Sequence, residues 1–548
     1  MKIGKRGAGI ALAALAVVAI VGVVLFNRYW YYLPGIMENL RDPVQPNREV
    51  TWDQGPAEAA VPANERRPNI VVILADDLGF NDISFGGGGI VPTPNIDSIA
   101  KRGVAFSNGY SGNATCAPSR AAIMTGRYAT RFGFEFTPAP PQFAETIATY
   151  AGNGAVYLAD REKDVPPVDR MSVPEDEIYI SKMLQEQGYR TLMLGKWHLG
   201  GTDTTRPETR GFDEALGFAP GASLFLPKND PNVVNSVQDF DPIDRFLWAN
   251  LPFAVQFNGG DRFEPSEYMT DYLTNEAVKA IQANRNRPFF MYLSYNAVHT
   301  PLQALKADYD NLSHIEDHAL RTYAAMIVAL DRGVGLVLDE LRKQGLEENT
   351  IVVFTSDNGG ANYIGLPDVN SPYRGFKASF FEGGIHVPFF LKWPGRVPEG
   401  KTIEHRAAHV DIFATAAAAA GASVAQDRVY DGIDLLGLTD WEGGLGERPL
   451  FFRSSHYKTL LKGDWKLQVS ERPKKNWLFN LAKDPTERVN LAGDNPEKLA
   501  EMMTALEEID GEQAEPIWPA LVEAPMMIDR PLGGAPRGPE DDFVFWAN

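Results

Sequence analysis

The chain has 548 residues, of which 44% are hydrophobic and 22% are charged, which is an ordinary composition for a globular protein. Its formal net charge of −19 argues against nucleic acid or an anionic membrane surface as the main partner. The length predicts a large domain with a smaller one, and the single cysteine excludes an internal disulfide.

The N-terminus predicts a membrane segment. Basic residues within the first six positions precede an apolar run over 8–26, close to the ~20 residues that span a bilayer. An aromatic cluster at 29–32 follows, as at a membrane interface. We interpret 1–32 as an uncleaved anchor with the body of the protein outside the cytoplasm, in the periplasm or the extracellular space. The alternative is a cleaved signal peptide and a secreted protein, although no small-x-small cleavage site closes the run.

Residues 33–67 show no hydrophobic periodicity and predict a linker. From 68 to 424, apolar runs alternate with helical stretches, which predicts an α/β domain with a mostly parallel central sheet flanked by helices. The strands expected are 69–75, 189–194, 289–295, 350–355 and 387–392. The helices expected are 93–102, 180–187, 271–284, 318–344 and 410–420.

Three further features complete the predicted organisation. Pro388 favours an edge position for the strand at 387–392. The irregular stretches 142–177 and 212–263 are expected to surround or cover a site. Residues 425–548 predict a smaller C-terminal α+β domain and tail. This domain is expected to contain antiparallel strands at 458–461, 465–469 and 477–481 and a helix over 495–508, and the sequence shows no clear structure from 525 onward.

Cys116 lies in the segment Cys116-Ala-Pro-Ser-Arg120. A lone cysteine is most often a buried structural residue. Here Pro118 suits the first turn of a helix, so Cys116 would lie at a helix N-terminus, where backbone N–H groups attract anions. Arg120 lies one turn into that helix and can point back toward its start. Together these residues predict a site for an anionic ester.

Polar clusters directly follow four of the expected strands. They contain Asp76, Asp77, Lys196, His198, His299, Asp357 and Asn358. Because ligands bind at the carboxyl ends of parallel strands, the clusters are expected to converge on one edge of the sheet. Three carboxylates and one amide oxygen favour Ca²⁺ or Mg²⁺ over zinc, although each Asp pair alone is equally typical of a turn. Lys377 lies among glycines and aromatic residues, which predicts a structured loop rather than a solvated lysine.

In their order along the chain, these blocks resemble the type I, formylglycine-dependent sulfatases of the alkaline phosphatase superfamily, and they are closest to the arylsulfatase A/B-like group. The resemblance covers 68–421 and continues weakly through 480–491. It implies an alkaline-phosphatase-like α/β fold with a smaller C-terminal sheet domain. It also implies a sulfuric ester hydrolase that converts sulfate monoesters to an alcohol or phenol and inorganic sulfate.

The resemblance also implies the site chemistry. A formylglycine-generating maturation enzyme would convert Cys116 to formylglycine (3-oxoalanine), whose hydrate attacks sulfur. One divalent cation, Ca²⁺ or alternatively Mg²⁺, would be bound by Asp76, Asp77, Cys116, Asp357 and Asn358. Arg120 and Lys196 would steady the formylglycine, and His198 would take its hydroxyl proton. His299 and Lys377 would contact the sulfate and the leaving oxygen.

Two other functions fit the same residues. A phosphodiesterase or phosphonate monoester hydrolase would use the same nucleophile, and an inactive anchored protein that binds sulfated glycans would keep an unmodified Cys116. The sequence predicts neither the natural substrate nor the oligomeric state.

Overall fold

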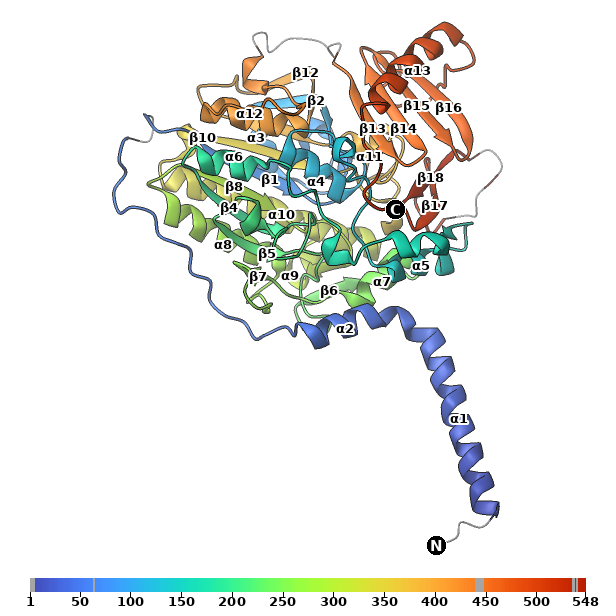
Figure 1. Cartoon of the computed structure of the whole chain (residues 1–548). Coiled ribbons are helices and arrows are strands. Elements are labelled where there is room, and N and C mark those ends of the chain that lie inside the picture. The colour runs from blue at the N-terminus through green and yellow to red at the C-terminus, as the bar shows by residue number, and fades with distance from the viewer. Residues whose placement is uncertain (1–4, 63–64, 439–447, 535–537, 539–540) are drawn as a thin grey trace.

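The computed structural model describes residues 5–62, 65–438, 448–534, 538 and 541–548. A long helix, α1 (Lys5–Tyr29), projects from a body in which helices cover a large sheet, and a smaller sheet stands beside that body (Figure 1). By length and composition, the helical stretch Ala13–Arg41 is able to cross a membrane, and its most apolar window is 0% buried against the protein. A short 3₁₀ turn joins α1 to α2 (Leu33–Arg41), so the expected linker begins with a helix.

The large sheet has nine strands in the order β12-β2-β11-β10-β1-β8-β4-β5-β7. Their bounds are β1 (Asn69–Ala75), β2 (Val104–Tyr110), β4 (Arg190–Lys196), β5 (Glu214–Phe218), β7 (Gln256–Phe257), β8 (Phe289–Ser294), β10 (Thr350–Ser356), β11 (Phe389–Lys392) and β12 (Lys401–Ala408). Only β11 and β7 run antiparallel to their neighbours within the described part of the chain. This confirms the predicted α/β class with a mostly parallel sheet.

Helices cover both faces of this sheet and enclose two hydrophobic cores. Successive residues of β1 point to opposite faces, so Val71 and Ile73 pack into one core while Ile70 and Val72 pack into the other. The first core is covered by α3 (Pro94–Lys101), α8 (Met269–Asn284) and α10 (His318–Lys343). The second is covered by α4 (Cys116–Thr125), α6 (Ile180–Glu186) and α12 (Val410–Ala420).

The prediction that 387–392 lies at a sheet edge was wrong. β11 pairs with β10 on one side and with β2 on the other. Pro388 precedes the first residue of the strand, so its missing N–H removes no bond from the ladder. The sheet continues past β11 through β2 and β12, whose mixed polar sequences did not predict strands.

The stretches that were expected to be irregular contain regular elements. Helix α5 (Pro141–Tyr150) and strand β3 (Val156–Tyr157) lie within 142–177 or at its start. Strand β5, strand β6 (Val233–Ser236), helix α7 (Pro242–Asn250) and β7 lie within 212–263. β6 pairs with β9 (Leu302–Leu305) in a separate ribbon, and α9 (Lys306–Asn311) follows it.

The C-terminal region forms the predicted antiparallel sheet. Its strands are β13 (Leu450–Ser454), β14 (Tyr457–Lys462), β15 (Trp465–Glu471) and β16 (Lys474–Asn480), and α13 (Pro496–Asp510) follows them. The tail from 525 onward, for which the sequence showed no clear structure, contains the end of β17 (Val522–Met527) and β18 (Phe543–Ala547), and β17 pairs with both β18 and β3. β3 lies before residue 424, whereas β17 and β18 lie after it, so this small sheet crosses the domain boundary expected there. That boundary stays a prediction.

Candidate active site

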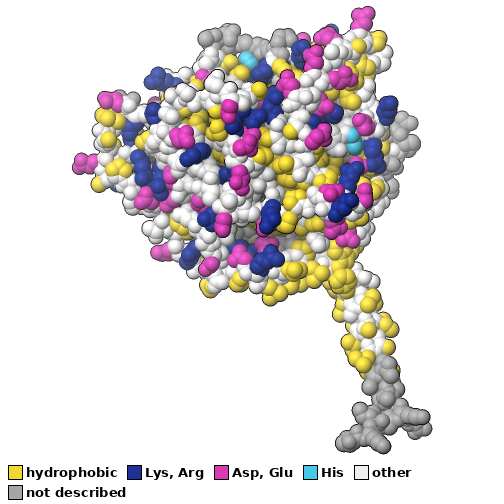
Figure 2. All heavy atoms as spheres, viewed as in Figure 1, with side chains coloured by type: hydrophobic (Ala, Val, Ile, Leu, Met, Phe, Trp, Pro, Cys, Tyr) yellow, Lys and Arg dark blue, Asp and Glu magenta, His cyan; other side chains and the backbone are white. Residues whose placement is uncertain are grey.

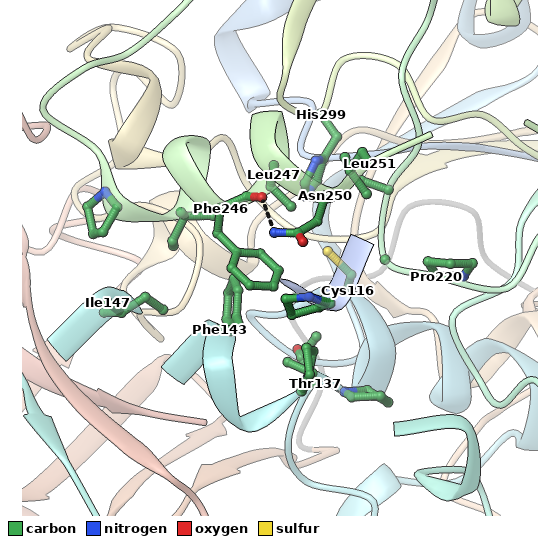
Figure 3. Close-up of a pocket in the computed structure, with 18 of the residues that line it drawn as sticks. Cys116, Thr137, Phe143, Ile147, Pro220, Phe246, Leu247, Asn250, Leu251 and His299 are labelled. Atoms are coloured by element: carbon green, nitrogen blue, oxygen red, sulfur yellow. Dashed lines mark hydrogen bonds between the residues drawn. The ribbon is translucent and has the colours of Figure 1, made fainter. Parts of the chain in front are cut away.

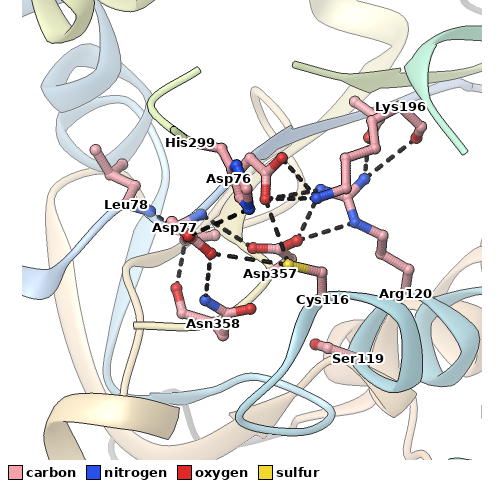
Figure 4. A network of polar contacts seen from close by, with 12 residues as sticks. Asp76, Asp77, Leu78, Cys116, Ser119, Arg120, Lys196, His299, Asp357 and Asn358 are labelled. Carbon is pink, nitrogen blue, oxygen red and sulfur yellow. Dashed lines mark hydrogen bonds and ion pairs between the residues drawn. The ribbon is translucent and has the colours of Figure 1, made fainter. Parts of the chain in front are cut away.

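The carboxyl ends of β1 and β10 bring three carboxylates and one amide together. Asp76 and Asp77 directly follow β1, and Asp357 and Asn358 directly follow β10. The Asp77 backbone N–H donates to Asp357 Oδ1 at 3.1 Å, and Asn358 Nδ2 donates to Asp77 Oδ1 at 2.8 Å (Figure 4). Asp77 has a positive φ of 59°, a sparsely populated conformation that is held by these contacts at the turn.

This cluster fits a hard divalent cation. All four side chains are buried, and Asn358 Oδ1 has no hydrogen-bond partner among the described residues. Potential ligand atoms of Asp76, Asp77, Cys116 and His299 lie within 4.8 Å of one another. Converging carboxylate oxygens with an unpartnered amide oxygen form the donor set that Ca²⁺ and Mg²⁺ prefer.

Cys116 is the first residue of α4, as Pro118 predicted. Its Sγ lies 3.6 Å from Asp76 Oδ1 and 3.8 Å from Asp77 Oδ1, and it receives a 3.1 Å hydrogen bond from Lys377 Nζ. Burial, followed by the charge of Asp357, raises the pKa of the thiol. An unmodified thiol here is therefore a poor source of thiolate at neutral pH.

Arg120 joins α4 to the carboxylates. It is 0% exposed, and its Nε and Nη2 donate to Asp357 Oδ2 at 2.9 and 2.7 Å. Its Nη1 donates to Ser294 Oγ and to the carbonyl oxygen of Lys196. Burial would raise the pKa of Asp357, but the charges of Arg120, Lys196 and Lys377 together outweigh it and hold this pKa far below the usual range.

Lys196, the last residue of β4, contacts the other side of the cluster. Its Nζ donates to both oxygens of Asp76, at 2.9 and 2.7 Å. Burial and the nearby Asp357 charge nevertheless raise the pKa of Asp76 well above its usual value. A bound divalent cation would favour the ionised form of Asp76, because an opposite charge lowers the pKa of a carboxyl group.

Lys377 links the cysteine, the carboxylates and a histidine. Its Nζ lies 2.8 Å from Asp77 Oδ1 and 3.3 Å from His299 Nε2. Burial opposes its charge, but the nearby carboxylate of Asp77 raises the pKa of Lys377 well above its usual value, so the ammonium is charged. It also donates to Tyr363 Oη at 3.0 Å, and that hydroxyl donates to Asp77 Oδ2.

The two histidines differ in their partners. His299 Nδ1 lies 2.6 Å from the carbonyl oxygen of Thr300, so Nδ1 carries the proton and Nε2 faces Lys377 as an acceptor. Both ring nitrogens of His198 are buried without partners among the described residues. Burial, followed by the charge of Lys196, lowers the pKa of His198 well below its usual value. Both rings are therefore neutral bases, since burial also lowers the pKa of His299.

A pocket of about 1400 Å³ opens above Cys116 and is lined by His198, His299 and Lys377. Figure 3 shows Cys116 and His299 facing this space, together with Phe143 and Ile147 of α5 and Phe246 and Leu247 of α7. The elements that supply these walls come from the stretches 142–177 and 212–263, as the sequence predicted for residues around a site.

The structure thus brings all ten predicted site residues into one cluster around Cys116 at the carboxyl edge of the sheet. Tyr363 and Ser294 belong to the same network and were not predicted, because neither lies in a motif with a distinctive spacing. Two buried cations and the partly buried Lys377, two neutral histidines and a hard-metal site lie below a pocket, and together they can bind an oxyanion ester and move protons to and from it.

Comparisons with known proteins point to one family. The family model described as Sulfatase matches residues 68–422, a range that contains all nine strands of the large sheet. Mouse N-acetylgalactosamine-6-sulfatase is 32% identical over 413 residues, which cover 73% of this chain and 72% of that protein. Human steryl-sulfatase is 30% identical over 461 residues, which cover 71% and 72%. The crystal structure of Ps i-CgsB matches with a TM-score of 0.70 at 34% identity, covering 83% of this chain and 95% of that one.

Proposed function

Because the chain belongs to the sulfatase family of the alkaline phosphatase superfamily and hydrolyses sulfate esters, we propose that its nucleophile is a formylglycine formed from Cys116. The observation that carries this proposal is the position of Sγ, 3.1 Å from Lys377 Nζ and 3.6 Å from Asp76 Oδ1 beneath the pocket. When formed, the formylglycine hydrate supplies one hydroxyl that attacks sulfur and a second whose deprotonation releases sulfate. The formylglycine-generating maturation enzyme is then a required partner.

We propose that the metal of this family member is Ca²⁺, bound by Asp76, Asp77, Asp357, Asn358 and the modified Cys116. An all-protein cage rich in carboxylates favours Ca²⁺, because Mg²⁺ dehydrates reluctantly and usually keeps several waters. When bound, the cation supplies a Lewis acid that offsets the charge on the sulfuryl oxygens.

The remaining residues are assigned roles from their contacts. Arg120 and Lys196 hold Asp357 and Asp76 in place, next to residue 116. His198, neutral and without a partner among the described residues, is the base for the hydroxyl proton at residue 116. Lys377 binds the sulfate oxygens as a positive charge, and His299 contacts the leaving oxygen. That oxygen takes its proton from the pair formed by Lys377 Nζ and His299 Nε2, which lie 3.3 Å apart and share the proton of the lysine ammonium.

We also propose that α1 anchors the protein and that the catalytic body is extracytoplasmic. The support is an exposed apolar helix followed directly by the aromatic residues at 29–32, with basic residues in front of it. A signal peptide passes the same test of length and composition, and cleavage would yield a secreted protein.

We expect the tryptic peptide Gly103–Arg120, taken from protein made in its native host, to be lighter than its sequence by the difference between a thiol and an aldehyde. The measurement is mass spectrometry, and addition of a hydrazide should label the same peptide, since only the aldehyde reacts. A quantitatively unmodified thiol in active protein would contradict the proposed nucleophile. An unmodified thiol in inactive protein would favour the binding-protein alternative.

We expect prolonged chelation to remove activity and added Ca²⁺ to restore more of it than equimolar Mg²⁺. The physical reason is that three buried carboxylates repel one another when no cation lies between them. Initial rates on an aryl sulfate, measured after dialysis against chelator and re-addition of each ion, test this. Greater recovery with Mg²⁺ would contradict the choice of Ca²⁺, and full activity after verified metal removal would contradict the site.

A further inference from the structure

The walls of the pocket above Cys116 are dominated by large apolar side chains. Phe143 of α5 and Phe246 of α7 meet edge to face, with ring centroids 5.4 Å apart, and Ile147, Leu247 and Leu251 lie beside them (Figure 3). The pocket's volume of about 1400 Å³ exceeds the ~300–1,000 Å³ that is usual for small-molecule sites. The space can hold a bulky apolar group in addition to a sulfate.

Two of the polar side chains in these walls, Asp241 and Asn250, are already used by the protein. Asp241 caps α7 by accepting from the N–H groups of residues 243 and 244. Asn250 accepts from Gly35 N at 2.7 Å and donates to the carbonyl oxygens of Tyr31 and Phe246. A glycan would need partners for its hydroxyl groups, because burying them unpaired is costly, whereas an apolar body needs none.

The helix α2 forms part of the pocket wall, although it directly follows the expected anchor. Leu33 and Met37, one turn apart on α2, line the pocket and are 40% and 58% exposed, as at a mouth. Ile36 and Leu40, on another side of α2, are 52% and 79% exposed and do not line the pocket. A helix with an exposed apolar face suits the interface of a bilayer.

Specific contacts fix α2 to the pocket walls, and these contacts set the orientation of the body relative to α1. Arg262 donates to Glu38 Oε1 at 2.7 Å and also bonds the carbonyl oxygen of Asp42. The buried Tyr31 ring packs edge to face on Tyr150 of α5, with centroids 5.8 Å apart. The end of α1 is therefore joined to both α5 and α7, and the pocket mouth lies beside the point where α1 leaves the body.

Figure 2 shows hydrophobic side chains gathered on the face of the body beside the base of α1. We propose that the natural substrate is a sulfate ester with a large apolar body, which enters this pocket from the membrane surface with its sulfate toward Cys116. This inference rests on the proposed function, and it names the substrate class of the same site. The mouth beside α2 brings the pocket to the membrane, and the walls match the buried part of the substrate.

The test uses the full chain in lipid nanodiscs, which avoids detergent that could fill the pocket. We measure kcat/KM for 4-alkylphenyl sulfates from ethyl to octyl, each below its critical micelle concentration. This series is chosen because the acidity of the phenol leaving group barely changes along it. We expect kcat/KM to rise roughly threefold to fourfold per methylene until the pocket is filled. A 6-O-sulfated hexosamine should be hydrolysed at least about tenfold less efficiently than the octyl compound.

A variant at the mouth makes the test specific. Met37→Gln should lower kcat/KM for the octyl compound several-fold more than kcat/KM for the ethyl compound. Leu336→Gln is the matched control, because Leu336 is 44% exposed on α10 and does not line the pocket. The Leu336→Gln variant should leave kcat/KM unchanged for both the ethyl and the octyl compound.

Two outcomes would overturn the inference while leaving the proposed function intact: a flat alkyl series with normal turnover, or a preference for the sulfated sugar. Calorimetric binding of 1-alkanesulfonates, which are not hydrolysed, asks the same question without turnover. If the protein hydrolysed none of the sulfate esters but bound 1-alkanesulfonates more tightly as their chains lengthened, only the proposed function would be contradicted. Affinity independent of chain length would overturn the inference.

Discussion

Replacing Cys116 by alanine will abolish sulfate-ester hydrolysis while the protein stays folded. Removing a nucleophile costs a factor on the order of 10⁶ in kcat in a well-studied hydrolase, and the loss of both formylglycine hydroxyls should cost at least ~10⁴. The fold should tolerate the change, because the site's main ion pairs, Lys196 with Asp76 and Arg120 with Asp357, do not involve Sγ. We expect a stability loss of about 1 kcal/mol.

Steady-state rates on an aryl sulfate, with thermal unfolding followed in parallel, measure both parts of this expectation. Cys116→Ser is the informative partner variant, since a serine keeps one hydroxyl and lacks the second. In a host without a serine-oxidising maturation enzyme, it should show at most slow or single-turnover activity. Multiple turnovers by Cys116→Ala at near-normal rate would refute the nucleophile.

The same assay separates sulfate hydrolysis from the phosphodiester and phosphonate alternatives. We expect kcat/KM for the sulfate monoester to exceed that for a matched phosphodiester. Both activities should disappear in Cys116→Ala if one nucleophile serves both. A residual activity toward one substrate alone would indicate contamination or a second site.

The site could be located from the sequence because most of its residues directly follow strands of a parallel sheet, where ligands bind. Strands such as β1 and β10 are buried on both faces and therefore read as continuous apolar runs, which fixes where each strand ends. In a parallel sheet those ends share one edge, so Asp76 and Asp357 could be placed together from positions far apart in the sequence. Strands β2 and β12 were not predicted, because their sequences mix polar and apolar residues and are not continuously apolar.

Several elements that build the pocket could not be predicted, because contacts distant in sequence stabilise them. Helix α2 has only nine residues, and a helix that short is marginal in isolation. It is held by Asn250 and Arg262, more than 200 positions away along the chain. Strand β17 contains Pro525, which argues against a strand, yet it pairs with β18 and β3. The resemblance predicts the roles of the site residues, and the stretches 142–177 and 212–263 predict part of the pocket wall, whereas the contribution of α2 to that wall is visible only in the structure.

Replacing Arg120 by alanine is expected to destabilise the protein by about 3–5 kcal/mol as well as inactivating it. Arg120 and Asp357 are both 0% exposed, so the variant leaves a buried carboxylate without its bidentate partner. Because Arg120, together with Lys196 and Lys377, holds the pKa of Asp357 far below its unfolded value, these contacts stabilise the fold above that value, and their contribution is lost as the pH falls. The difference between wild type and variant should therefore be largest near neutral pH and shrink below about pH 4.

Urea unfolding at several pH values measures this effect, and Arg342→Ala is the matched control. Arg342 is 54% exposed and pairs with Asp339 on the surface, so its loss should cost at most about 1 kcal/mol. The double variant Arg120→Ala with Asp357→Asn should lose less unfolding free energy than the sum of the losses in the two single variants. The reason is that Asp357→Asn removes the buried charge that Arg120→Ala leaves unpaired. An Arg120→Ala variant as stable as Arg342→Ala, or strictly additive losses in the double variant, would mean that the pair does not couple α4 to the end of β10.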